Sequence, residues 1–173
     1  MSFKWKNDSI KRNFGFYIEQ LNFKENRFHA IYFVDSLTGA LLLSKRYSSG
    51  NNYGLTETDD DLISNFLNAI NMFIREIRTN KEEEIQEINF KDTRILYEKK
   101  GRLLCVGITK KTNVNVERAI LHELLKDFYY RFEDIIQYFK GYVPPEIINY
   151  KNRLESIDLN SLFKFDINLE KKI

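Results

Sequence analysis

The stretch from residue 28 to residue 77 constrains the fold of this chain more than any other. It begins with two apolar runs, FHAIYFVD and ALLLSKRY, which a short SLTG turn joins. Asp and Ser at the start of a turn and Gly at its end are typical of a hairpin. The runs 28–35 and 40–47 are therefore predicted to be paired strands. The first is apolar on both faces and should be central, whereas the second becomes charged at Lys45 and Arg46, which indicates an edge strand.

The clearest amphipathic helix follows the hairpin and begins at Thr58 or Asp59. Its apolar side chains recur at helical spacing and fall within an arc of about 160° at about 100° per residue. We expect this arc to be buried against the sheet. It is formed by Leu62, Ile63, Phe66, Leu67, Ala69, Ile70, Phe73, Ile74 and Ile77.

The opposite face of the same helix carries small, uncharged polar side chains, where a solvated helix of a charged protein would carry Lys and Glu. Another subunit can cover such a face without burying an unpaired charge. We therefore predict a partner interface here, although the frequent use of Asn throughout the chain would also place Asn on this face. The candidate interface residues are Ser64, Asn65, Asn68, Asn71, Met72 and Arg75.

The rest of the chain is predicted to form three strands and two helices. The strand candidates are 85–90, 94–99 and 103–110, and the helix candidates are 115–140 and 146–157. The short links between the strands make them antiparallel. The strand 103–110 is apolar on both faces and should be central, so helices are required on both sides of one sheet. The long helix could bend or split near Phe132 and is ended by Gly141.

This order of elements resembles the longin fold and the related roadblock fold. The matching segments are IYFVDSLTGALLLSKRY, DDDLISNFLNAINMFIREI, INFKDTRILYEKKGRLLCVGITKK and ERAILHELLKDFYYRF. The resemblance covers about residues 28–140 and is to longin-like proteins of archaeal type, related to eukaryotic trafficking and GTPase-regulating subunits. It implies an α/β (α+β) fold: a longin-like, five-stranded, mostly antiparallel sheet sandwiched by helices.

The resemblance also implies a division of the chain and a non-catalytic role. The predicted parts are an N-terminal extension (1–27), which has features of both an amphipathic helix and an extra strand, a longin-like domain (28–140), and a C-terminal helix with a docking tail (141–173). Longin-like domains pair through a helix face and a sheet edge. We therefore expect a homo- or heterodimer with another longin- or roadblock-like chain that binds a small Ras-like GTPase or serves in a trafficking-like complex.

The composition of the chain narrows the kinds of partner and the cellular location that we expect. The net charge of +2, from 27 basic and 25 acidic residues, argues against a nucleic-acid partner. A local basic excess at Lys4, Lys6, Lys11 and Arg12 surrounds Trp5 and suggests a second hypothesis, a peripheral membrane-surface adaptor, beside a soluble charged tail. The sequence has neither an apolar run of the ~18 residues that span a bilayer nor a signal core. We therefore expect a cytoplasmic protein.

The sequence offers no catalytic, metal-binding or cofactor-binding motif, so no enzyme, metal or cofactor is predicted. Cys105 is the single cysteine and should be a small buried hydrophobe in its strand. His29 and His122 lack the spacing of metal ligands, and the acidic run 59–61 is explained by the helix dipole at a helix start. The polar loop 48–57 leaves a third hypothesis, a ligand sensor or enzyme with this loop as a lid.

Overall fold

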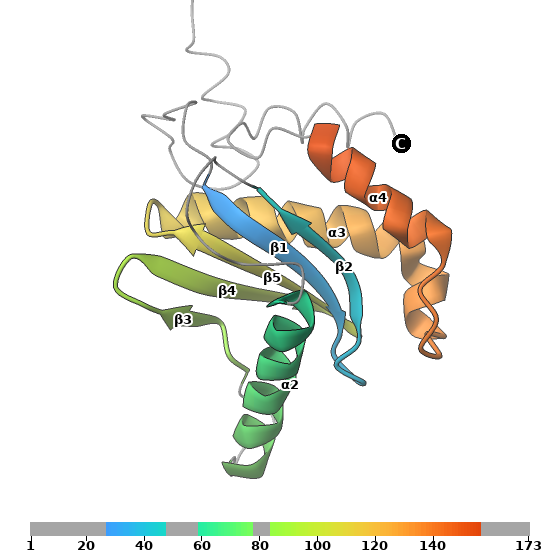
Figure 1. Cartoon of the computed structure of the whole chain (residues 1–173), viewed down its shortest axis with the longest axis horizontal. Coiled ribbons are helices and arrows are strands. Elements are labelled where there is room, and N and C mark those ends of the chain that lie inside the picture. The colour runs from blue at the N-terminus through green and yellow to red at the C-terminus, as the bar shows by residue number, and fades with distance from the viewer. Residues whose placement is uncertain (1–26, 48–58, 78–83, 157–173) are drawn as a thin grey trace, which may run out of the picture.

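The computed structural model describes residues 27–47, 59–77 and 84–156 of the 173 (Figure 1). Its elements are β1 (Phe28–Asp35), β2 (Leu41–Arg46), α2 (Asp59–Ile77), β3 (Glu87–Asn89), β4 (Thr93–Lys100), β5 (Leu103–Lys110), α3 (Val114–Gln137) and α4 (Pro145–Ser156). The predicted order of strands and helices is confirmed. The predictions for the N-terminal extension, the 48–57 loop and the docking tail lie outside the described residues.

The five strands form one antiparallel sheet in the order β2-β1-β5-β4-β3. The two strands predicted to be central, β1 and β5, lie side by side in the middle, and β2 lies at an edge, as predicted from its charged end. The fold is therefore longin-like, with an antiparallel sheet between helices, as the resemblance implied.

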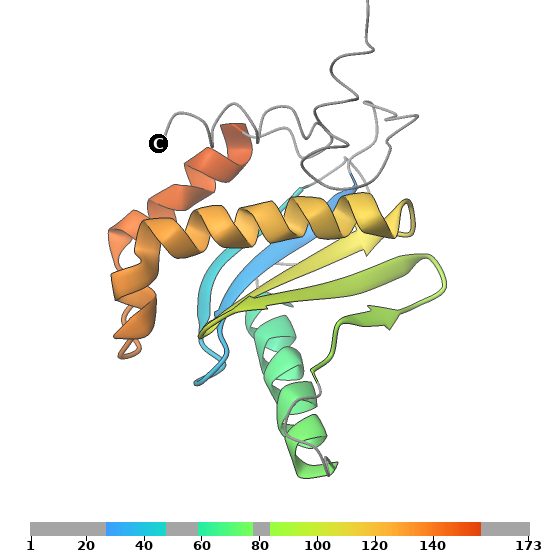
Figure 2. The same cartoon turned by 180° about the vertical axis from the view of Figure 1, so that it is seen from behind.

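Helices cover the two faces of the sheet unequally. Helices α3 and α4 lie on one face, whereas α2 meets the other face beside β2 (Figures 1 and 2). The larger core lies under α3 and α4, and its aromatic centre consists of Phe33, Phe128, Phe132 and Tyr150.

The register of β1 departs from strict alternation at the start of the strand. Strict alternation along a strand would place Phe28 and Ala30 on one face, but a bulge between them in the β1–β5 pair places Phe28 in the α3 core and Ala30 in the opposite one.

Helix α3 has a defined start and a bend. The Asn113 side chain accepts hydrogen bonds from the backbone N–H groups of Asn115 and Val116, at 3.1 and 3.4 Å, and so caps the helix. The backbone leaves helical geometry at Phe132, where φ is −124° and ψ is 24°. The bend predicted near Phe132 is confirmed. It lets the last turn of α3 lead into α4 on the same face of the sheet (Figure 2).

A buried carboxylate fixes the end of the hairpin. Asp35 accepts hydrogen bonds from the backbone N–H of Thr38, at 3.0 Å, and from the Thr38 hydroxyl. It also accepts two from Arg102, with the Nε atom 2.6 Å from Oδ1. Arg102 in turn donates to the carbonyl oxygens of Gln137 and Phe139 at the end of α3. One acidic residue thereby ties the β1–β2 turn to the β4–β5 turn and to α3.

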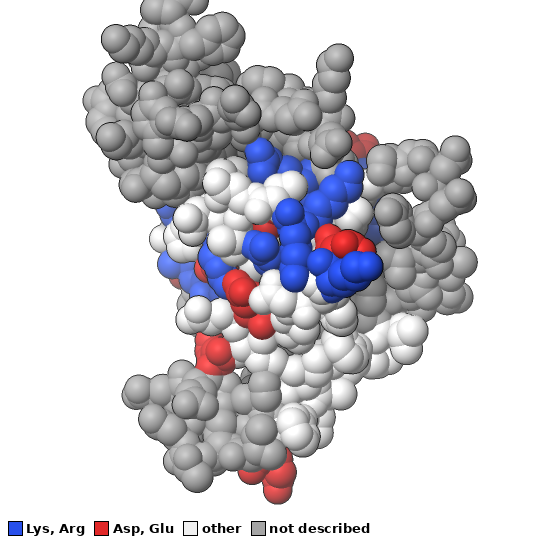
Figure 3. Space-filling view, turned by 90° about the vertical axis from the view of Figure 1, so that its left-hand side faces the viewer, with Lys and Arg blue, Asp and Glu red and all other residues white. Residues whose placement is uncertain are grey.

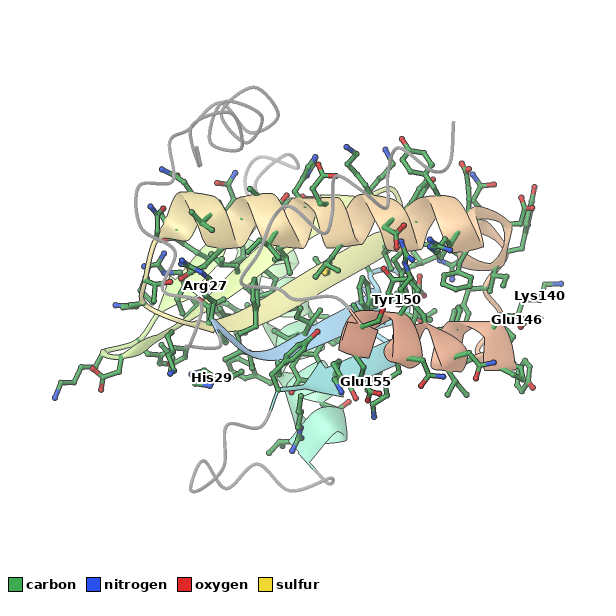
Figure 4. All side chains as sticks on the ribbon, turned by 90° about the horizontal axis from the view of Figure 1, so that it is seen from above. Arg27, His29, Lys140, Glu146, Tyr150 and Glu155 are labelled. Carbon is green, nitrogen blue, oxygen red and sulfur yellow. The ribbon has the colours of Figure 1, made fainter. Side chains whose placement is uncertain are left out.

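Helix α4 is held to α3 by a second buried carboxylate, Asp127. The Tyr150 hydroxyl donates to Oδ2 at 2.8 Å, Arg153 Nε donates to the same oxygen at 2.8 Å, and Arg131 Nε lies 3.1 and 3.0 Å from the two oxygens. Figure 4 shows Tyr150 on α4 pointing toward α3. Burial by itself raises the pKa of Asp127, but the hydrogen bonds from Arg153, Arg131 and Tyr150 outweigh it and hold the pKa below its usual value.

This geometry predicts an acid-sensitive contribution to stability. Because the pKa of Asp127 is lowered in the folded state, its contribution is complete above the unfolded value of about 4 and is lost as the pH falls through the folded value. Asp127→Asn should therefore lower the free energy of unfolding at pH 7 by roughly 1–3 kcal/mol. Urea unfolding of the wild type and of D127N at a series of falling pH values measures this effect, and the two free energies of unfolding should become equal in acid. A difference between them that stays constant with pH would contradict the role assigned to Asp127.

The orientation predicted for α2 is wrong. Its apolar arc was expected to be buried along the sheet, but Leu62, Phe66 and Phe73 are exposed and, among its described side chains, only Leu67 is fully buried. The reason is the course of the helix. Helix α2 meets the sheet near its N-terminal half and then extends beyond it, instead of lying along it (Figures 1 and 2). An amphipathic pattern fixes which side chains share a face, but not how much of that face the sheet can cover.

Candidate partner interface

Among the described side chains of α2, Leu67 contacts the sheet and Asn68 contacts the β1–β2 turn. Leu67 is 1% exposed and packs into the smaller core, with Tyr32, Tyr97 and Leu104 of the strands. Asn68 is half-buried and packs on the β1–β2 turn, where a Cβ built on Gly39 would lie only 2.6 Å from the Asn68 Cγ atom. Gly39 has a φ of 77°, so the turn needs glycine both for its backbone and for this contact.

The opposite side of α2 is apolar and exposed. Leu62, Phe66 and Phe73 are 66%, 45% and 63% exposed. Together with the exposed Ala69 they lie within about 60° of one another at about 100° per residue. Met72, 61% exposed, borders them. We call Leu62, Phe66, Ala69, Met72 and Phe73 the α2 apolar face. A run of large exposed apolar side chains on one helix marks an interaction site.

The predicted interface residues are distributed over more than one side of the helix. Asn65 and Met72 are exposed, and Met72 belongs to the α2 apolar face. Asn68 instead contacts its own chain at Gly39. The side chains of the other three, Ser64, Asn71 and Arg75, lie outside the described part of the helix. Sequence reasoning missed Leu62, Phe66 and Phe73 as interface candidates because it assigned them to the core.

Neither edge of the sheet offers a long, unobstructed strand. At β3 only three residues pair with β4, and Glu87 of this strand forms an ion pair with Arg118 at 2.8 Å. At β2 the neighbouring α4 contributes Glu155, whose carboxylate lies 2.7 Å from Lys45 Nζ. Short and charged edges disfavour pairing with another strand. Among the described surfaces, the α2 apolar face is therefore the better candidate for binding a partner.

The described residues offer few side chains that could bind a metal ion or take part in catalysis. No group of three or more His, Cys, Asp and Glu side chains within 27–47, 59–77 and 84–156 could hold a metal ion. Cys105 is fully buried, as predicted, and burial raises the pKa of its thiol far above the usual value, which keeps it protonated. His29 is half-buried, whereas His122 is exposed and its Nδ1 lies 3.6 Å from Glu98 Oε2.

A shallow hollow of about 260 Å³ lies where α3 leads into α4. It is lined by Ile135, Tyr138, Phe139, Lys140, Tyr142 and Pro144. This lining offers an ammonium group and two phenols but no carboxylate or imidazole, so it lacks an acid–base pair for catalysis. The loop 48–57, the lid of the third hypothesis, lies outside the described residues.

The possible membrane-contact residues also lie outside the described part of the chain. They are Lys4, Trp5, Lys6, Lys11 and Arg12. Of the described helices, none combines the length and the apolar character that crossing a bilayer requires.

Comparison with known proteins finds similarity in structure. No family model matches the chain, and no curated protein matches it. Among solved structures, the chain is similar to Myxococcus xanthus MglB, with a TM-score of 0.46 and 18% sequence identity over 78% of this chain and 99% of that one. The longin-like assignment rests on the order of elements and strands described above.

Proposed function

We propose that this chain is a non-catalytic interaction module that pairs with a second copy of itself through the α2 apolar face. The pair would bind or regulate a small Ras-like GTPase, alone or as part of a trafficking-like complex. The observation that carries the proposal is the exposure of Leu62, Phe66, Met72 and Phe73 together on one helix.

The energetics favour covering this face. Burying a large apolar side chain gains roughly 1.5–3 kcal/mol, and this face holds several such chains within a few turns of one rigid helix. The rigidity matters because little conformational freedom is lost when a preformed helix docks. At about 100° per residue, Asn65 and Glu76 fall between Ala69 and Met72 around the helix. Glu76, the charged residue of this arc among the described side chains, lies one turn beyond Met72, at the C-terminal end of the face. A partner therefore buries no unpaired charge at the centre of the contact.

A second copy is the partner that this surface fits best. An uncharged apolar helix face needs no charge complementarity and can pair with itself about a two-fold axis. The short, charged strand edges at β2 and β3 do not compete for the same role. A related but different longin-like chain is the alternative partner, and the measurement of mass separates the two.

The assignment of a GTPase as the further partner is supported by the resemblance of residues 28–140 to longin- and roadblock-like domains. These domains act in pairs, so a GTPase surface would be created or completed by the dimer. We therefore assign this chain a role in binding or positioning the GTPase, in line with the non-catalytic role that the resemblance implies.

Light scattering on the purified chain, alone and with a panel of Ras-like GTPases in their GDP and GTP forms, tests the proposal. We expect the mass of a dimer for the chain alone, and a further rise in mass with at least one GTPase that depends on its nucleotide. A dimer that binds no GTPase would remove the GTPase from the proposal. A strict monomer that binds none would reject the proposal as a whole.

A further inference from the structure

The hollow of about 260 Å³ between α3 and α4 is lined mainly by rings. It lies on the face of the sheet opposite α2 (Figure 1). Tyr138 and Tyr142 are 73% and 74% exposed, the highest values among the large apolar side chains that the structure describes. Their rings are therefore available to a ligand. We call the whole lining the junction hollow: Ile135, Tyr138, Phe139, Lys140, Tyr142 and Pro144.

The backbone around the junction hollow is fixed by the fold. Phe139 and Ile147 are buried in the larger core and hold the two sides of the junction. Arg102, which is paired with Asp35, donates to the Phe139 carbonyl at 3.1 Å. The Ile147 N–H donates to the Pro144 carbonyl at 3.1 Å at the start of α4. A ligand therefore meets a preformed surface, and little order is imposed on this chain when it binds.

The size and place of the junction hollow narrow the class of ligand. Sites for drug-sized molecules usually measure about 300–1,000 Å³, so this smaller hollow suits one or two side chains of a peptide. A helical peptide needs a groove long enough for anchors at i, i+3, i+4 and i+7, and an added strand needs a free sheet edge. The lining comes from the short stretch 135–144, which contains no strand. A short extended peptide fits it best.

We propose that the junction hollow binds a proline-rich segment of another protein in the polyproline II conformation. Such segments dock between aromatic rings and are already extended when free, so they lose little conformational freedom on binding. Their carbonyl oxygens lack internal partners, and the Tyr138 and Tyr142 hydroxyls can donate to them. The segment belongs to a partner because this chain has only two prolines, and both lie at the hollow itself, as Pro144 and Pro145.

The charge at the rim favours an acidic residue beside the prolines. Lys140 is the charged residue of the lining, is exposed, and forms no ion pair with a described residue. Figure 4 shows it at the end of the molecule where α3 leads into α4. An Asp or Glu of the bound segment would pair with it. A pair at an exposed rim changes affinity only a few-fold, so the rings supply most of the binding.

This proposal does not depend on the proposed dimer or on a GTPase. The junction hollow and the α2 apolar face belong to different faces of the sheet (Figures 1 and 2). The L62E/F73E variant, which alters only α2, should therefore bind a proline-rich peptide as the wild type does. Failure of either proposal leaves the other to be measured.

Fluorescence anisotropy with short labelled peptides tests the rings. The probe is a proline-rich peptide with glutamates at one end, and its reference peptide has alanine in place of every proline. The wild type should bind the probe about tenfold more tightly than the reference, and Y138A/Y142A should lose about tenfold or more in affinity for the probe. The matched control F90A/Y130A removes two aromatic side chains, 49% and 59% exposed, outside the hollow and should retain binding.

A charge reversal tests the rim. K140E should bind the probe about fivefold more weakly, but should bind a proline-rich peptide with glutamine in place of glutamate as the wild type does. The matched control K91E changes an exposed lysine of the β3–β4 turn and should leave both affinities unchanged. That turn lies at the other end of the molecule, where Figure 3 shows Lys and Arg gathered on the described surface.

Circular dichroism must show that all variants are folded. Equal affinity of the wild type for the probe and its alanine reference would overturn the proposal, as would equal losses in Y138A/Y142A and F90A/Y130A. Absence of binding to any proline-rich peptide at ~1 mM would also overturn it, because that limit corresponds to only about 4 kcal/mol of binding free energy.

Discussion

Replacing Leu62 and Phe73 by Glu is expected to convert the paired protein into a folded monomer. Both side chains are mostly exposed in the single chain, so the charges stay solvated and the fold survives. In a two-fold pair the same substitutions would bury carboxylates against an apolar surface and against one another. Unpaired buried charges cost several kcal/mol, so we expect the dissociation constant to rise by about 100-fold or more. Sedimentation equilibrium of L62E/F73E beside the wild type measures this change.

A matched control separates this effect from a general loss of surface hydrophobicity. Tyr142 is 74% exposed near the α3–α4 junction, away from α2, so Tyr142→Glu also places a carboxylate on an exposed aromatic position. It should leave both the mass and the unfolding temperature unchanged. If L62E/F73E keeps the mass of a dimer, the α2 apolar face is not the interface. If Y142E alone dissociates the pair, the interface lies at the end of α3.

Phe128→Ala is expected to produce the largest loss of stability of any single truncation discussed for this protein, roughly 3–5 kcal/mol. The Phe128 ring is fully buried and stacks on Phe33 with ring centroids 4.1 Å apart. The centroids of Phe132 and Tyr150 lie 4.9 and 5.0 Å away. Removal of the ring therefore leaves a cavity among three aromatic neighbours from the sheet, α3 and α4.

Phe66→Ala should cost much less stability than Phe128→Ala. From periodicity alone this residue belongs to the core, and its truncation would cost as much as that of Phe128. In the structure Phe66 is 45% exposed, so the monomer should lose only about 1 kcal/mol. Urea unfolding at low protein concentration compares the two variants. If the chain dimerises, the loss of unfolding free energy in F66A relative to the wild type should grow with protein concentration, because association stabilises only the folded state. A loss of 3–5 kcal/mol for F66A at low concentration would show that α2 is buried against its own sheet.

The local elements of the fold were predictable because their signals are local. The hairpin follows from an Asp–Ser start and Gly39, whose φ is indeed positive, and the edge position of β2 follows from Lys45 and Arg46. The long helix bends near Phe132, where a bend or split was predicted. These features depend on neighbours a few residues apart in sequence.

The tertiary contacts of the candidate site were not predictable in the same way. Periodicity shows that α2 has an apolar and a polar side, but it does not show how much of the apolar side the sheet covers. Leu67 packs against the sheet and Asn68 contacts Gly39, and no spacing in the sequence signals these contacts. Likewise, Arg102 reaches Asp35 across 67 positions, so the partner of that carboxylate could not be named from the sequence. The bulge that moves Phe28 to the other face has no sequence signal that we can identify.

Hydrogen exchange on the wild-type chain, below and above the concentration at which it associates, tests most directly whether the α2 apolar face is the partner interface. The amides of α2 should exchange more slowly at the higher concentration, while those of α4 should exchange at the same rate at both. A doubled mass with unchanged exchange in α2, or slowed exchange confined to β3 or α4, would contradict the assignment of this face.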